Sequence, residues 1–150
     1  MIKIFLLVIL LLSSSVAIDK LYFLPKDSKK VQKDMEELFK NAKESIEVAI
    51  YNISDRKIVE VLNDAANRGI KVKLYFYKKK AELSDKIDAV KVMDKLHTKL
   101  AIVDKKIVIF GSANWTSESF SENYEVIYIS DKEKIVEEFN SFYKTIKKDK

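Results

Sequence analysis

The chain has 150 residues, 47% of them hydrophobic, which is enough for one domain with a single ordinary core. Its formal net charge of +5 comes from an excess of lysine. This charge favours a polyanionic partner such as nucleic acid or an acidic membrane, although a lysine-rich coding bias gives the same composition. The absence of cysteine excludes disulfides, zinc sites built on thiolates and thiol nucleophiles.

The N-terminus has the pattern of a secretory signal. A lysine near the start is followed by an unbroken apolar run at residues 4–12 and by small residues that offer a cleavage point after Ala17. The apolar run is shorter than the roughly 20 residues of a spanning helix, but slightly extended it makes a marginal uncleaved anchor. We therefore expect residues 1–17 to be a signal peptide or membrane anchor. The rest of the chain is then periplasmic or secreted, or held at the membrane by this segment.

The first half of the remaining chain alternates strand and helix patterns. Apolar residues that alternate with polar ones predict strands, and apolar residues three or four apart predict helices. The expected elements are an edge strand at 21–24, a helix from an N-cap at Ser28 to Ala42, a strand at 46–50, a helix from near Ser54 to Gly69, and a strand at 70–77. This order implies right-handed crossovers and a sheet covered by helices, which is an α/β fold.

The second half adds more strands and a closing helix. Its expected elements are a short polar candidate helix at 81–87, strands at 89–93, 98–103 and 107–110, a turn at 104–106, a strand at 124–129, and a helix at 135–146. No internal repeat, low-complexity segment or flexible linker interrupts the sequence, so we expect a single domain.

The residues that carry chemistry lie at the start of one predicted strand and the end of the next. Positions two apart on a strand face the same way, so His97 and Lys99 project together and both can meet one phosphate. If the two strands pair as a hairpin, the second returns beside the start of the first and brings Ser112 and Asn114 next to the histidine. A nucleophile or base, a fixed positive charge and two neutral donors suit a phosphodiester with a charged transition state.

This spacing is the signature of the phospholipase D superfamily, H-x-K-x(4)-D-x(6)-G-S-x-N, met here by His97, Lys99, Asp104, Gly111, Ser112 and Asn114. The chain resembles in particular the small bacterial endonucleases of that superfamily, which have a signal peptide, one motif copy and about this length. The resemblance implies that residues 18–150 form a phospholipase D-like nuclease domain, with a mixed sheet flanked by helices on both faces.

The resemblance also implies roles for the motif residues. His97 is the implied nucleophile, which forms a phosphohistidine intermediate. Lys99, with Ser112 and Asn114, is implied to hold the non-bridging oxygens and to stabilise the developing charge. Glu125 stands where the family has an acidic residue that orients the histidine.

Two further expectations follow from the motif. Asp104, after the strand, is expected to be structural rather than catalytic. Double displacement needs a second histidine as the acid, and this chain has one histidine. The resemblance therefore implies a homodimer in which two copies of His97 meet across a two-fold axis.

Aromatic and basic residues near the motif allow two interpretations each. Trp115 and Tyr124 flank the site segment and either stack on bases or belong to the core. The run Lys78-Lys79-Lys80 follows a strand and either guides a phosphate backbone or is a solvated loop.

Three functions remain open from the sequence. The first is an exported endonuclease that hydrolyses DNA, with single-stranded DNA and RNA as further substrates. It would need no metal or cofactor, because the carboxylates do not cluster and no nucleotide-binding loop is present. The second is a lipid phosphodiesterase of the phospholipase D type at the cell envelope. The third is a non-catalytic DNA-binding component of an uptake system. Small size, a single motif and basic charge favour the nuclease, and the complete motif argues against the non-catalytic module.

Overall fold

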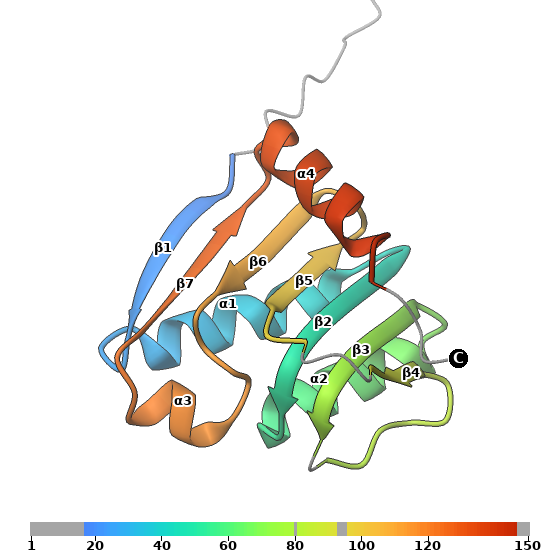
Figure 1. Cartoon of the computed structure of the whole chain (residues 1–150), viewed down its shortest axis with the longest axis horizontal. Helices are drawn as coiled ribbons and strands as arrows, with labels where there is room; N and C mark the ends of the chain where they lie inside the picture. The colour runs from blue at the N-terminus through green and yellow to red at the C-terminus, as the bar shows by residue number, and fades with distance from the viewer. Residues whose placement is uncertain (1–16, 80, 93–95, 147–150) are drawn as a thin grey trace, which may run out of the picture.

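The computed structural model describes residues 17–79, 81–92 and 96–146, which form a mixed sheet with helices packed against it (Figure 1). In chain order the elements are β1 (Asp19–Leu24), α1 (Ser28–Asn41), β2 (Ser45–Ile53), α2 (Arg56–Asn67), β3 (Lys71–Lys79), β4 (Asp88–Lys91), β5 (Lys99–Val103), β6 (Ile107–Gly111), α3 (Ser117–Ser121), β7 (Glu125–Ser130) and α4 (Glu133–Tyr143). Among the described residues the sheet has seven strands, in the order β1-β7-β6-β5-β2-β3-β4. The predicted α/β fold is confirmed.

Strand β2 joins a parallel part of the sheet to an antiparallel part. It pairs parallel with β3, which pairs parallel with β4, and α2 makes the crossover from β2 to β3. On its other side β2 pairs antiparallel with β5, and β6, β7 and β1 continue the antiparallel order to the edge. Because β5 and β6 form the predicted hairpin, the end of β6 returns beside the start of β5.

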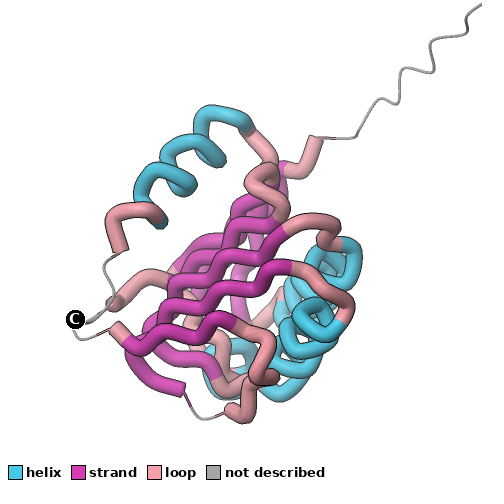
Figure 2. The backbone as a smooth tube through the Cα atoms, turned by 90° about the vertical axis from the view of Figure 1, so that its right-hand side faces the viewer, coloured by secondary structure: helices cyan, strands magenta, loops and turns pink. Residues whose placement is uncertain are grey.

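Helices lie on both faces of the sheet (Figure 2). On one face, Val31, Met35 and Phe39 of α1 are fully buried in the main core, because they recur at helical spacing. Helix α2 contributes its own buried residues to this core. On the other face, Val136 and Tyr143 of α4 belong to a second, smaller cluster. The predicted arrangement of a sheet flanked on both faces is confirmed.

Helix α4 leaves apolar side chains exposed on β1 and β7. Leu21 and Phe23 are 54% and 52% exposed, and Val126 is 41% exposed. Strand alternation explains the exposure on β1, since the intervening Tyr22 and Leu24 point into the core. Phe23 and Val126 are direct partners in the β1–β7 register, so their side chains form one continuous apolar surface.

The predicted helix at 81–87 is wrong. This segment has no helical hydrogen-bond pattern, and the side chain of Asn63 on α2 holds it in an irregular path. The Asn63 amide accepts from the Ser84 N–H at 2.8 Å and donates to the Glu82 carbonyl at 3.2 Å. A tertiary contact therefore takes the backbone groups that a helix would need.

Two helix starts also differ from the prediction. Helix α1 has Asp27, not Ser28, at its N-cap position, and the Asp27 carboxylate accepts from the Phe23 N–H at 2.9 Å. Helix α3 was not predicted, because five mostly polar residues show no helical periodicity. It begins after Thr116, whose hydroxyl accepts from the Ser119 N–H at 3.1 Å, as an N-cap residue does.

Some predicted segments fall outside the described residues. The predicted signal or anchor lies there except for Ala17, and so does Met93 at the end of the strand predicted at 89–93. None of the helices in the described ranges is both long enough and apolar enough to span a membrane.

Candidate active site

His97 and Lys99 lie together at the start of β5. His97 precedes the strand and its side chain is exposed, while Lys99 opens the strand and is only 8% exposed. The Lys99 ammonium lies 3.4 Å from Nδ1 of His97 and donates a hydrogen bond to the His97 carbonyl at 2.9 Å. Thr98 between them is fixed to β2, because its carbonyl accepts from the Tyr51 N–H at 2.9 Å. The structure thus brings the imidazole and the ammonium to one place.

Gly111 and Ser112 come to the same end of the sheet through the β5–β6 hairpin. The register that pairs Leu100 with Phe110 places Lys99 beside Gly111. Ser112 is then fastened to β7, because its N–H donates to the Val126 carbonyl at 3.0 Å and its hydroxyl oxygen accepts from the Val126 N–H at 3.0 Å. The Ser112 hydroxyl position is therefore set by backbone contacts.

Gly111 has a steric reason for being glycine. A Cβ atom at this position would lie 2.0 Å from the Val126 carbonyl oxygen and 3.0 Å from Cα of Ile127. Both neighbours are backbone atoms of β7, so no side chain can rotate out of the way. The motif glycine is required for the close approach of β6 to β7 that positions Ser112.

Glu125 contacts Ser112. Its carboxylate accepts a hydrogen bond from the Ser112 hydroxyl, and within the described ranges no hydrogen bond joins it to His97. Its negative charge also acts on Lys99. Burial lowers the pKa of Lys99 below the ordinary lysine value, and the negative charge of Glu125 opposes that shift. The site therefore holds a partly desolvated ammonium next to an exposed imidazole.

Asn114 lies on the loop after β6 and carries an unsatisfied amide. Its Oδ1 atom is buried and has no hydrogen-bond partner among the described residues, and the same is true of Asn52 on β2. The loop is joined to the end of β2, since the Trp115 N–H donates to the Asn52 carbonyl at 3.1 Å. An unpaired buried polar group costs about 1–3 kcal/mol, and each of these two amide oxygens would need a hydrogen-bond donor to remove that cost.

Asp104 occupies the opposite end of β5 from His97. Its carboxylate accepts from the backbone N–H groups of Lys43, Glu44 and Ser45 at 2.9, 2.7 and 3.0 Å. Burial raises the pKa of Asp104, but these three donors outweigh it and hold the pKa below its ordinary value. The contacts join the β5–β6 turn to the α1–β2 loop, which is what we expect of a residue that stabilises the fold.

The two aromatic candidates, Trp115 and Tyr124, differ in their exposure to solvent. Trp115 is 1% exposed and packs against Phe39 with ring centroids 5.9 Å apart, so its role as a base-stacking residue is wrong and it belongs to the core. Tyr124, just before β7, is 93% exposed. It lines a surface hollow of about 240 Å³ that also includes Ser112, Glu125 and Phe23. This hollow joins the motif residues to the apolar surface of β1 and β7.

Two tyrosines that no sequence pattern indicated, Tyr51 and Tyr77, also lie near the site. The Tyr51 ring stands edge-on to the His97 ring with centroids 5.1 Å apart, and the Lys99 ammonium lies 5.7 Å from the Tyr51 ring centre. Tyr77 stacks on the Tyr51 ring. No local pattern marks these tyrosines, because only the pairing of β2 with β3 and β5 brings them to the site.

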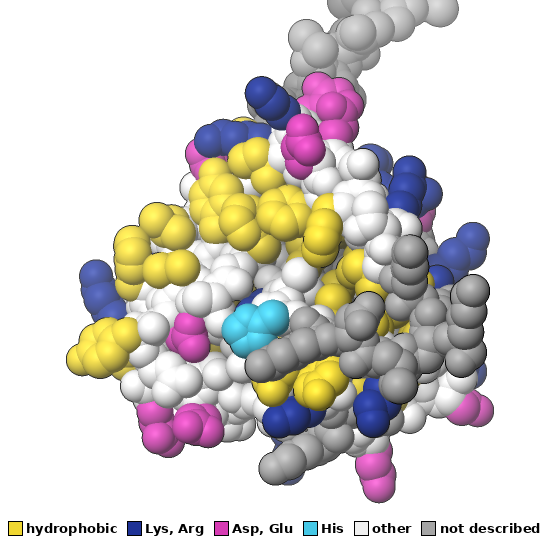
Figure 3. All heavy atoms as spheres, in the orientation of Figure 1, with side chains coloured by type: hydrophobic (Ala, Val, Ile, Leu, Met, Phe, Trp, Pro, Cys, Tyr) yellow, Lys and Arg dark blue, Asp and Glu magenta, His cyan; other side chains and the backbone are white. Residues whose placement is uncertain are grey.

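The exposed imidazole appears in cyan on the surface in Figure 3, on the face that also carries exposed apolar side chains. Nowhere in the described ranges do three His, Asp or Glu side chains gather so that they could hold a metal ion.

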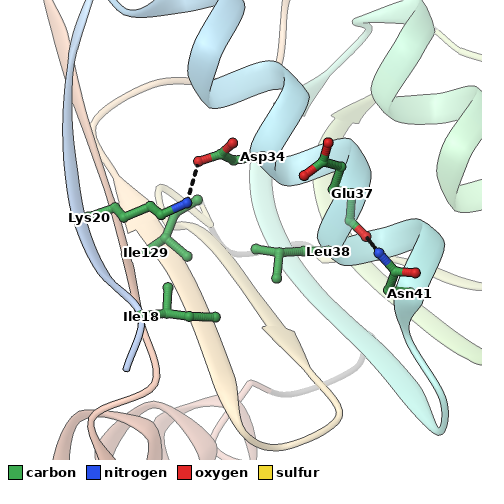
Figure 4. Close-up of a pocket in the computed structure, with 7 residues that line it drawn as sticks. All are labelled: Ile18, Lys20, Asp34, Glu37, Leu38, Asn41 and Ile129. Carbon is green, nitrogen blue, oxygen red and sulfur yellow. Dashed lines mark hydrogen bonds and ion pairs between the residues drawn. The ribbon is translucent and has the colours of Figure 1, made fainter. Parts of the chain in front are cut away.

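A separate cavity of about 180 Å³ lies between β1 and α1 (Figure 4). Its polar groups already have partners, because Lys20 forms an ion pair with Asp34 at 2.8 Å and the Asn41 amide donates to the Glu37 carbonyl at 2.9 Å. Burial raises the pKa of Asp34, but hydrogen bonds from Lys20 and Tyr22 outweigh it and hold the pKa low. The cavity shares no residue with the motif.

Comparison with known proteins agrees with this geometry. A family model described as "Cardiolipin synthase, PLD-like domain" matches residues 35–147. The protein named phospholipase D from Rickettsia conorii is 33% identical over 109 residues, which are 65% of this chain and 54% of that protein. The chain thus spans about half the length of this relative.

Two solved structures have the same fold. NucT from Helicobacter pylori matches with a TM-score of 0.77 and 25% identity, covering 87% of this chain and 96% of that one. Nuc from Salmonella typhimurium, described as a phospholipase D family member, matches with a TM-score of 0.70 and 20% identity, covering 87% and 94%. The fold, the motif geometry and the family match over residues 35–147 together show that the chain belongs to the phospholipase D-like family.

Proposed function

We propose that this chain is an exported endonuclease that hydrolyses phosphodiester bonds of DNA without a metal ion, with single-stranded DNA and RNA as further substrates. One observation carries the proposal: an exposed imidazole, that of His97, has the Lys99 ammonium 3.4 Å from its Nδ1 atom. An imidazole attacks phosphorus, and a fixed charge beside it stabilises the negative charge that develops on the non-bridging oxygens. The net charge of +5 favours nucleic acid as the polyanion.

The proposed reaction has two displacements. In the first, the unprotonated ring nitrogen of His97 attacks phosphorus, a P–N bond forms, the P–O bond to the leaving group breaks, and the leaving oxygen takes a proton from a general acid. In the second, water gives a proton to that group and attacks phosphorus, the P–N bond breaks, and His97 is restored. Lys99, with Ser112 and Asn114, holds the non-bridging oxygens in both steps.

The general acid is proposed to come from a second copy of the chain. The sequence contains one histidine, so a histidine acid must be the partner's copy of His97. The exposure of this side chain leaves room for such a partner. The apolar surface of Leu21, Phe23 and Val126 supports the same proposal, because it continues from the hollow at Ser112 and has the chemistry of a subunit interface.

Export is proposed from the signal pattern at residues 1–17, either by cleavage after Ala17 or with the segment kept as an anchor.

A lipid phosphodiesterase is the second candidate function. The exposed apolar side chains beside Glu125 would also suit a lipid surface, and the Rickettsia relative bears the name phospholipase D. The basic net charge and the tyrosine pair beside His97 favour nucleic acid instead.

The test uses the purified chain in EDTA with plasmid DNA, a single-stranded oligonucleotide and phospholipid vesicles. We expect cleavage of nucleic acid that survives the chelator, and a fall of at least about a thousandfold in His97→Ala, as for other nucleophile variants. Lys106→Ala, at the opposite end of β5, is the matched control and should keep the activity.

Each alternative has its own outcome. Hydrolysis of the vesicles with intact nucleic acid would replace the nuclease by a lipid phosphodiesterase. Nucleic acid binding without turnover of any substrate would indicate the non-catalytic module. Activity that disappears in EDTA and returns with added metal would refute the metal-independent mechanism.

A further inference from the structure

Tyr51 and Tyr77 form a stacked pair beside the motif residues. The parallel register that pairs Asn52 with Lys78 sets the two tyrosines side by side on β2 and β3. Their ring centroids are 5.3 Å apart and their planes differ by 17°, which is an offset-stacked geometry. Since the Tyr51 ring is 5.1 Å from the His97 ring, a row of three rings leads from the nucleophile to Tyr77.

Two ammonium groups accompany this row. The Lys78 ammonium lies 5.4 Å from the Tyr51 ring centre and that of Lys99 lies 5.7 Å from it. Lys78 is exposed at the end of β3, whereas Lys99 is buried at the start of β5. Both positive charges therefore lie near the middle ring, one of them buried beside His97 and the other at the surface.

The two tyrosines differ in how much of each ring is already in contact. Tyr51 has the rings of Tyr77 and His97 and both ammonium groups within 5.1–5.7 Å of its ring centre. Tyr77 is half-buried, and within the described ranges its one ring contact is with Tyr51. The Tyr77 ring is therefore supported by Tyr51 and remains partly exposed to solvent.

We propose that Tyr77, supported by Tyr51, is a stacking platform for an unpaired nucleobase, and that Lys78 contacts a phosphate next to that base. The proposal rests on the proposed nuclease function and adds a preference for single strands to it. Stacking on an aromatic side chain needs a base with a free face, which a paired base inside a duplex lacks. A phospholipid offers no such ring.

The spacing of the rings suits a nucleic acid strand that runs from the scissile phosphate to the Tyr77 platform. Ring-to-ring steps of 5.1 and 5.3 Å join His97 to Tyr77. A nucleotide advances by about 3.4 Å when stacked as in a duplex, so the base on Tyr77 lies within about three nucleotides of the cleaved bond.

The test measures the dissociation constant of a single-stranded oligonucleotide and of an abasic oligonucleotide of the same length. The parent is His97→Ala, so that nothing is cleaved, and salt is held constant. Tyr77→Leu should weaken binding of the normal oligonucleotide about tenfold. The loss of one stacked base is expected to weaken binding by about 5- to 150-fold. Tyr77→Phe keeps the ring and should change binding less than about twofold. With the abasic oligonucleotide, Tyr77→Leu should bind like the parent.

Lysine variants test the phosphate contact. Lys78→Gln should weaken both oligonucleotides alike and reduce the slope of log affinity against log salt by about 0.7, as expected for one lost contact to a single strand. Lys106→Gln, in the turn at the far end of β5, is the matched control and should leave both dissociation constants unchanged.

The outcomes separate this inference from the proposed function. Equal weakening of the normal and abasic oligonucleotides by Tyr77→Leu, or no weakening of either, would overturn the platform even if the wild-type chain cleaves DNA. Weaker binding to phospholipid vesicles with unchanged oligonucleotide binding would overturn it in favour of a lipid contact. No cleavage of nucleic acid by the wild-type chain would instead refute the proposed nuclease.

Discussion

The chain has two glycines under different constraints, and replacing each by alanine tests the account of the motif turn. A Cβ on Gly111 would lie 2.0 Å from the Val126 carbonyl oxygen, whereas ordinary contact begins near 3.4 Å. A Cβ on Gly69 would meet nothing within 4 Å, but the residue has φ +91°, where side chains are strained. Gly111→Ala therefore tests close packing of two strands, and Gly69→Ala tests backbone conformation alone.

The expected magnitudes differ. To accept Gly111→Ala, β6 and β7 must separate by about 1.4 Å, the difference between the two distances above. This separation breaks the two 3.0 Å hydrogen bonds between Ser112 and Val126, at about 1 kcal/mol each, and adds strain of about 1–3 kcal/mol. We expect a loss of about 3–5 kcal/mol, a large part of the roughly 5–15 kcal/mol of a typical domain. Gly69→Ala should cost about 1–2 kcal/mol.

Urea unfolding monitored by Trp115 fluorescence measures both losses, because this single tryptophan is 1% exposed in the folded chain. With a slope of about 2 kcal/mol per molar urea, the midpoint should fall by about 2 M for Gly111→Ala and by less than about 1 M for Gly69→Ala. The proposed nuclease activity should also fall in Gly111→Ala under folding conditions, since Ser112 is displaced. An equal or smaller effect of Gly111→Ala than of Gly69→Ala would contradict a steric requirement for glycine at position 111.

Two further predictions concern Asp104 and the apolar surface. Asp104→Asn should lower the free energy of unfolding at pH 7 by about 1.5–3 kcal/mol, because a carboxylate that accepts three backbone N–H groups is lost. Burial alone would raise the folded-state pKa of Asp104, but the backbone donors outweigh this effect and depress the pKa below its ordinary value. The stability difference between wild type and Asp104→Asn is therefore fully present above about pH 4 and is lost as the pH falls through the depressed pKa. Urea titrations from pH 7 to 2.5 check this, and an advantage independent of pH would contradict it. Phe23→Glu should convert the proposed dimer to monomers in sedimentation, because Phe23 is 52% exposed beside the motif turn, while Phe142→Glu, 40% exposed on α4, should sediment like wild type. Dimers in both variants, or monomers in both, would contradict the placement of the interface.

Much of the fold follows from local patterns in the sequence. Alternation and helical spacing are properties of a few neighbouring residues, and they predicted the strands around the motif and helices α1, α2 and α4. The pairing of His97 with Lys99 was predictable for the same reason, since it depends on one short stretch of extended backbone. The approach of Ser112 needed only the assumption of a hairpin, which the register of β5 and β6 confirms.

The elements that sequence patterns missed depend on tertiary contacts or on single caps. The segment 81–87 is irregular because Asn63 on α2 takes its backbone hydrogen bonds. Helix α3 depends on the hydroxyl of Thr116 and on one buried apolar side chain, Phe120, which is too little for a periodic signal. Tyr51 reaches His97 only because β2 pairs with β5, a contact between segments far apart in the chain.

The two parts of the proposed site are therefore held by different constraints. Ser112 is positioned by backbone contacts between β6 and β7, and Lys99 by the hairpin, so almost any change there disturbs the chemistry. Tyr77 stands on β3, outside the hairpin, and depends on the parallel register with β2. Its side chain can change without moving the backbone that carries the motif. A change at Tyr77 should thus alter the preference for single-stranded nucleic acid while the reacting groups stay in place. For this reason substrate preference and catalysis can be tested separately in this fold.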